Sequence, residues 1–220
     1  AGGFGQRMGA MLAIIPALKQ LPCVQGMLRR GVASAERLFS VLDADDELDA
    51  GTRPLARARG LIEFRDVRLV YPDQPRPALD GISFTARPGT VTAIVGRSGG
   101  GKSTLVKLIP RFYEPDGGQI LLDGHPLADY PLADLRRQLA MVGQQVMLFD
   151  GTVAANVAYG ELGGAPEAGV MQALRDANAM EFVEHLPDGT QAQIGVKGGK
   201  LSGGQRQRLA IARALLADPR

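Results

Sequence analysis

The chain has 220 residues, of which 45% are hydrophobic and 22% charged, an ordinary composition for one globular domain or one domain with an appendage. Its net charge of +2 predicts no particular partner, and its scattered basic residues give no support to a nucleic-acid-binding stripe, so we expect no nucleic-acid partner. The single cysteine, Cys23, excludes an internal disulfide and a multi-cysteine metal site, and it fits a reducing compartment.

Residues 1–42 contain the apolar run MGAMLAIIPALKQL at 8–21, which is shorter than the roughly 20 residues that span a bilayer. Three interpretations are open: the last turns of a membrane helix, a buried helix of a soluble domain, or a signal peptide with Arg7 before its apolar core. A helix with one apolar stripe is predicted next, because the apolar positions are spaced four, three, four and three apart: Leu28, Val32, Ala35, Phe39 and Leu42.

Residues 43–60 are a predicted linker, because five acidic residues within Asp43–Asp49, then Gly51 and Pro54, leave no apolar periodicity. Strand patterns follow this linker. The run LIEFRDVRLVY alternates out of phase on either side of Arg65–Asp66, which predicts a strand with a bulge or a short turn there. GISFTARPG predicts a second strand, and the apolar run TVTAIVG predicts a strand that is buried on both faces.

The segment GRSGGGKST fits the P-loop pattern G-x-x-x-x-G-K-[ST] between that third predicted strand and an apolar helix pattern. Glycines let backbone N–H groups surround a phosphate, Lys102 supplies a cation for the β- and γ-phosphates, and Ser103 offers a hydroxyl to Mg²⁺. The segment therefore predicts ATP and Mg²⁺ as ligands. The predicted phosphate-binding residues are Gly96, Arg97, Ser98, Gly99, Gly100, Gly101, Lys102, Ser103 and Thr104.

A second glycine motif, LSGGQ at 201–205, precedes the helix pattern RQRLAIARAL. Ser202 is a predicted helix cap, and the N–H groups of Gly203 and Gly204 would make another anion site at the start of the helix. This motif resembles the signature of ATP-binding-cassette (ABC) ATPases. Together with RFYEPDGGQILLDGHPLADY and MVGQQVMLFDGTVAANVAYG, it makes residues 61–220 similar to exporter-type ABC proteins, most of all the bacterial lipid A exporter family.

The resemblance implies an α/β fold of the P-loop NTPase type: an ABC nucleotide-binding domain with a RecA-like core and antiparallel β and helical subdomains. The domain would occupy residues 61–220 and be incomplete at its C-terminus, behind the end of a last transmembrane helix and its cytoplasmic extension in residues 1–42. It further implies that Tyr71 stacks on adenine and that Gln144 reaches Mg²⁺ and the attacking water. Lys102 and Gln144 are thus the candidate catalytic residues, and Ser103 and Gln144 the candidate metal ligands.

In this family the signature of one chain, here Ser202, Gly203, Gly204 and Gln205, closes on the ATP held by the P-loop of a second copy. The resemblance therefore implies a homodimer in the inner membrane, attached to a transmembrane domain, with its ATPase domain on the cytoplasmic side. It would export a lipid or another amphipathic substrate. A soluble ABC ATPase without a transport role, and a nucleotide-binding fragment without turnover, are the alternatives.

Three departures from the family pattern stand out. Val196 occupies a position where exporters commonly have a glutamate, which puts the coupling role of that loop in doubt, and Gly100 replaces a frequent serine. The strand with an Asp–Glu pair that follows the signature helix in this family is not found before Arg220. We therefore expect these 220 residues to be a fragment that binds ATP with little or no hydrolysis.

Overall fold

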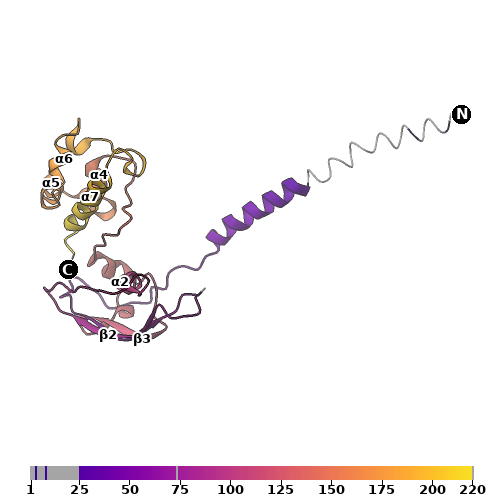
Figure 1. Ribbon diagram of the computed structural model, residues 1–220, viewed down its shortest axis with the longest axis horizontal. Helices are drawn as coiled ribbons and strands as arrows, with labels where there is room; N and C mark the ends of the chain where they lie inside the picture. Colours follow the sequence, from indigo (N-terminus) through magenta and orange to yellow (C-terminus); the bar gives the residue numbers. More distant parts are fainter. Residues whose placement is uncertain (1–2, 4–7, 9–24, 73, 220) are drawn as a thin grey trace. The chain divides into compact units, whose positions relative to one another are not determined.

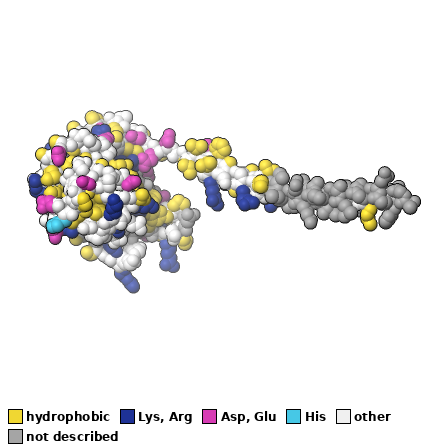
Figure 2. Space-filling view, turned by 90° about the horizontal axis from the view of Figure 1, so that it is seen from above, with side chains coloured by type: hydrophobic (Ala, Val, Ile, Leu, Met, Phe, Trp, Pro, Cys, Tyr) yellow, Lys and Arg dark blue, Asp and Glu magenta, His cyan; other side chains and the backbone are white. Residues whose placement is uncertain are grey.

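The computed structural model describes residues 3, 8, 25–72 and 74–219, and the chain divides into two compact units, Ala1–Leu48 and Asp49–Arg220. In the first unit, residues 25–42 form the predicted amphipathic helix, whose hydrophobic and basic side chains lie along opposite sides (Figure 2). Its apolar stripe is exposed, with Leu28 64% and Phe39 58% accessible. No helix among the described residues combines the length and the apolar character needed to cross a membrane. All of the first apolar run after Met8, residues 9–21, lies outside the described residues, so its three interpretations stay open.

The second unit contains an antiparallel sheet with the strand order β2-β1-β3-β4 (Figure 1). The strands are β1 (Ile62–Leu69), β2 (Leu79–Ala86), β3 (Gly117–Leu122) and β4 (His125–Pro126). β1 and β2 are the first two predicted strands. The predicted bulge is confirmed, because the register of β1 against β2 shifts between Phe64 and Val67 and Asp66 has a φ of 51°.

One face of this sheet packs on α2 (Lys102–Leu108), the 3₁₀ turn η1 (Leu127–Asp129) and α3 (Leu132–Arg137). Phe64 lies parallel to Phe84 of the neighbouring strand, with ring centroids 4.6 Å apart. Tyr130 is buried here, and its hydroxyl donates to the Leu122 carbonyl at 3.0 Å. Burial and then the nearby Asp123 carboxylate raise the pKa of this phenol above its usual value. The remaining buried side chains of this core include Val67, Leu69, Leu79, Leu105, Leu108, Ile120, Leu122 and Leu135.

Residues 49–60, which belong to the predicted linker, lie against this sheet unit. Leu55 and Ala58 are buried in its core. The Leu55 N–H donates to the Asp134 carboxylate, and the Ala58 N–H donates to the Gln138 side chain at 3.1 Å. The division between the two compact units therefore falls between Leu48 and Asp49, inside the predicted linker range.

A second hydrophobic core is built from helices that follow in the chain (Figure 1). They are α4 (Val153–Val157), α5 (Glu167–Asp176), α6 (Met180–Val183) and α7 (Gly203–Leu216), joined by the 3₁₀ turns η2 (Gly160–Gly164), η3 (Gly189–Gln191) and η4 (Val196–Gly198). α7 packs against both α4 and α5. Fully buried Val153, Val157, Leu174 and Leu209 form the centre of this core.

The prediction of a third strand at TVTAIVG is wrong. Residues 91–96 form no strand, and the side chains of Val91 and Val95 are 100% and 88% exposed. A buried parallel strand needs backbone partners and covering side chains on both faces. No described residue supplies a strand partner to this segment. The apolar run therefore has the composition of a buried strand but lacks the neighbours that would bury it.

Candidate functional site

The phosphate-loop segment surrounds a cavity of about 700 Å³. Residues from three separate parts of the chain meet there: Tyr71 after β1, the loop before α2, and Gln144. The structure thus brings together most of the residues that the sequence predicts for ATP. The described lining residues are Tyr71, Gln74, Arg76, Pro77, Ala78, Ser98, Gly99, Gly100, Gly101, Lys102, Ser103, Thr104 and Gln144.

The shape of the loop depends on glycine at position 101. Gly101 has a φ of 77°, and a Cβ there would overlap the carbonyl of Ala78 and lie 2.8 Å from the Leu79 side chain. No L-residue with a side chain fits this position without movement of its neighbours. Gly99 has the same φ but open space around it. The Gly100 N–H donates to the Arg97 carbonyl at 3.1 Å, which closes the turn before the helix.

Lys102 is already anchored on its own loop. Its ammonium donates to the carbonyls of Gly96, at 2.9 Å, and Arg97, at 2.7 Å. Gly96 and Arg97 are therefore connected to the cavity through Lys102, whose ammonium they hold beside it. An entering phosphate would exchange neutral carbonyl acceptors for a charged one, and the charge-assisted bond is the stronger of the two.

Tyr71 lines the same cavity and is held from two sides. Its hydroxyl lies 3.1 Å from the Thr104 hydroxyl, and its ring meets the Tyr113 ring at 89° with centroids 5.2 Å apart. Thr104 is buried, and its hydroxyl is within hydrogen-bond distance of the Tyr71 hydroxyl. Tyr71 also packs against the core of the sheet unit. The aromatic ring is therefore both part of the packing and exposed to the cavity.

Ser103 and Gln144 are exposed at the cavity, where a hydroxyl and an amide oxygen are available to a hard cation. Two polar residues of the cavity, Gln74 and Arg76, are not predicted from the sequence. They lie in the loop between β1 and β2, a short run with three prolines. The sequence did offer a signal for Arg76: it follows the candidate base-stacking tyrosine in the same loop, and arginine is well suited to binding phosphate.

The signature residues lie apart from this cavity. Ser202 caps α7 as predicted: its hydroxyl accepts from the Gln205 N–H at 3.2 Å, and the Gln205 side chain accepts from the Ser202 N–H at 2.8 Å. This capping box engages the side chains of both residues. Gly203 and Gly204 are exposed at the helix start, and a Cβ at Gly204 would meet nothing within 4 Å. None of the four lines the phosphate-loop cavity among the described residues.

A polar junction ties the segment after Gln144 to the signature helix. Buried Asn156 exchanges two hydrogen bonds with the backbone of Phe149, at 2.8 and 3.0 Å. Arg213 of α7 donates to the Asn156 carbonyl at 2.8 Å and to the Met147 carbonyl at 3.2 Å. Its guanidinium lies over the Tyr159 ring, and burial lowers the pKa of this arginine below its usual value.

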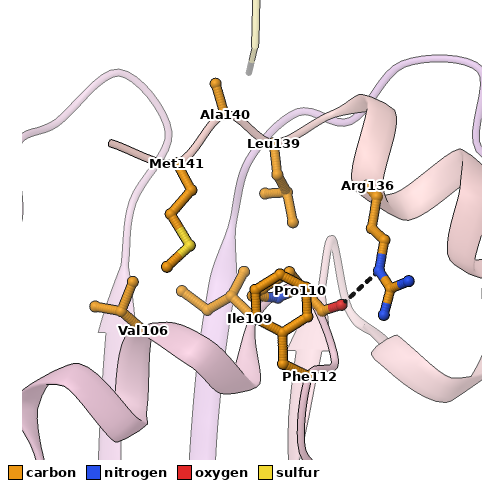
Figure 3. A pocket seen from close by; sticks show the side chains of 8 residues that line it. All are labelled: Val106, Ile109, Pro110, Phe112, Arg136, Leu139, Ala140 and Met141. Atoms are coloured by element: carbon orange, nitrogen blue, oxygen red, sulfur yellow. Dashed lines mark hydrogen bonds between the residues drawn. The ribbon is translucent and has the colours of Figure 1, made fainter. Parts of the chain in front are cut away.

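A second cavity, of about 240 Å³, lies between the end of α2 and the residues after α3 (Figure 3). Its lining is apolar except for Arg136, whose Nε donates to the Pro110 carbonyl and whose guanidinium lies over the Phe112 ring. A nucleotide needs donors for its phosphates, and this cavity offers few. The phosphate-loop cavity is the better nucleotide site. The residues that line the apolar cavity are Val106, Ile109, Pro110, Phe112, Arg136, Leu139, Ala140 and Met141.

Comparison with known protein families agrees with this geometry. Residues 79–220, which contain the phosphate loop, Gln144 and the LSGGQ motif, match the model of the family described as ABC transporter. The chain belongs to the ABC transporter family. This confirms the predicted fold class, an α/β nucleotide-binding domain with an antiparallel β part.

Curated ABC relatives align with nearly the whole chain. It is 67% identical over 99% of its length to the "ATP-dependent lipid A-core flippase" of Xylella fastidiosa (strain Temecula1 / ATCC 700964), and 67% identical to that of Xanthomonas euvesicatoria pv. vesicatoria (strain 85-10). It spans 37% of the length of each. Among solved structures, a bacterial Atm1-family ABC exporter with ATP bound is 38% identical, with a TM-score of 0.77 over 94% of this chain and 36% of that one.

Proposed function

We propose that this chain is the nucleotide-binding part of an ABC exporter that uses ATP to move a lipid A-like or other amphipathic molecule across a membrane. The observation that carries the nucleotide role is the single cavity shared by the phosphate loop, Tyr71 and Gln144. The flippase relatives support the lipid substrate, because they align with 99% of the chain, including residues before the ABC domain. That same alignment disfavours the alternative of a soluble ABC ATPase without a transport role.

In this proposal the loop residues 96–104 hold the phosphates, with Lys102 as the cation, and Tyr71 stacks on the base. Mg²⁺ would take the Ser103 hydroxyl and the Gln144 amide oxygen as ligands, together with phosphate oxygens of the nucleotide. Bound there, the ion would neutralise charge on the transferred phosphoryl group. Gln144 would orient the attacking water. Arg76 adds a second cation to the residues that line the cavity.

The signature residues would serve a second copy of the chain. Gly203 and Gly204 expose backbone N–H groups at the start of α7, away from the phosphate-loop cavity of their own chain. A two-fold arrangement would place them on the nucleotide of the partner, as the family resemblance implies. We propose that the dimer joins a transmembrane domain in the inner membrane, with this part on the cytoplasmic side, where ATP is available.

The test of nucleotide binding is Lys102→Ala. The variant loses the cation for the β- and γ-phosphates, and charge-assisted hydrogen bonds are worth about 1.5–3 kcal/mol, so MgATP affinity should fall about tenfold or more. Titration with a fluorescent ATP analogue measures it. Lys107→Ala, five residues further along the same helix and outside the cavity, is the matched control and should bind normally. Equal affinity of Lys102→Ala and the unmodified chain would refute the assignment.

We also propose that these 220 residues turn ATP over slowly. None of the described residues that line the cavity carries a carboxylate to accept a proton from water. Loss of general-base assistance costs about 10²–10⁴-fold in rate. Phosphate release by the same preparations checks this, and release at the rate of a full-length flippase relative would contradict it.

A further inference from the structure

The ring of Tyr71 is held at an orientation that the phosphate loop alone does not determine. Its hydroxyl is bonded to Thr104, the last residue of the loop motif, with 3.1 Å between the oxygens. This bond fixes the far end of the side chain. It leaves the ring free to turn about its long axis, and that rotation decides which surface a base would meet.

Tyr113 restrains this rotation. The two rings are perpendicular, at 89°, with centroids 5.2 Å apart, which is the favourable edge-to-face geometry of aromatic pairs. Tyr113 follows α2 and does not line the cavity. Tyr113 is 39% exposed and does not belong to the buried core of the sheet unit, so we expect that core to stay intact when the ring is removed. A contact with the nucleotide would therefore run through Tyr71 rather than through Tyr113 itself.

We propose that Tyr113 is a positioning residue for nucleotide-base binding: it holds the Tyr71 ring in the plane that stacks on the base, with Thr104 fixing the opposite end. This inference rests on the proposed nucleotide site. Affinity for the base then depends on the pair of Tyr71, in the loop after β1, and Tyr113, in the turn after α2. Phosphate affinity stays with Lys102 and the loop.

The test compares two ligands, MgATP and magnesium tripolyphosphate, which has the phosphates but no base. Tyr113→Ala should weaken ATP binding about two- to tenfold, the range expected for an aromatic pair, and leave tripolyphosphate binding unchanged. Tyr113→Phe keeps the ring and should bind ATP normally. A melting curve for each variant shows that it is folded, and a global destabilisation would weaken both ligands alike.

A double-mutant cycle identifies the route of the effect. In a Tyr71→Ala background, in which the affinity for each ligand is measured first, adding Tyr113→Ala should change neither affinity further. If Tyr113→Ala weakens ATP equally with and without Tyr71, or weakens tripolyphosphate as well, the proposal is overturned. If Tyr71→Ala weakens ATP while Tyr113→Ala does not, the positioning role fails and base stacking stands. If Lys102→Ala leaves tripolyphosphate binding unchanged, the phosphate site itself is wrong.

Discussion

At the scale of single residues, the phosphate loop shows how two glycines with the same backbone conformation have different requirements. Gly99 and Gly101 both have a φ of 77°, a left-handed conformation that costs other residues roughly 1–2 kcal/mol. Only Gly101 also faces close neighbours, the Ala78 carbonyl and the Leu79 side chain. Gly101 is thus required by both conformation and space, and Gly99 by conformation alone.

This difference predicts the outcome of a matched pair of substitutions. Gly101→Ala should destabilise the chain by about 1–3 kcal/mol more than Gly99→Ala, because its new methyl group must displace the β2 end of the sheet unit. Urea unfolding midpoints measure the difference, and ATP titration should show the larger loss for Gly101→Ala. Equal midpoints for the two variants would mean that the loop moves freely away from Ala78.

At the scale of elements, the segment after Gln144 and the signature helix α7 are joined by polar contacts rather than by apolar packing alone. Asn156 satisfies the N–H and the carbonyl of Phe149 and also donates to the Thr152 carbonyl at 3.0 Å. Arg213 then bonds to the backbone of Asn156. Through these bonds the backbone at Met147 and Phe149 is connected to α7.

Asn156→Ala should therefore destabilise the chain by about 1–3 kcal/mol, because it removes a buried amide together with its bonds to the Phe149 backbone and to the Thr152 carbonyl. Thermal or urea unfolding is the measurement. Gln172→Ala is a suitable control, because its bond to Asp176 is exposed on α5 and should change stability by about 0.5 kcal/mol or less. A loss for Asn156→Ala no larger than this control would show that water replaces the asparagine.

The sequence predicted correctly those features that depend only on residues close together in the chain. The β1 bulge at Asp66 and the Ser202 cap depend on residues within a few positions, and both are confirmed. The bond between Tyr71 and Thr104 joins residues 33 apart, and that between Arg213 and Asn156 joins residues 57 apart. No periodicity in one sequence specifies such pairs, because they depend on how the elements pack.

At the scale of the whole molecule, the same reasoning explains the error at residues 91–96. An apolar composition shows that a segment could be buried as a strand, but burial also requires neighbouring strands and covering side chains. The structure gives partners to β1, β2 and β3 on the sheet, and none of the described residues pairs with this run. The phosphate loop is consequently ordered from its C-terminal side, by Gly101, α2 and Tyr71. Stability should then be uneven along the Asp49–Arg220 unit.

Amide hydrogen exchange followed by mass spectrometry measures this unevenness. Amides of residues 91–95 should exchange at close to the rate of an unfolded peptide, because their N–H groups have no protein acceptor among the described residues and their side chains are largely exposed. Peptides from β1 and β3 should be protected, since their ladder bonds open only when the sheet unit unfolds. Saturating MgATP should slow exchange in the loop that follows and leave residues 91–95 fast, because the nucleotide contacts the loop side of the cavity. Protection of residues 91–95 equal to that of β1, without nucleotide, would show that a strand forms there after all.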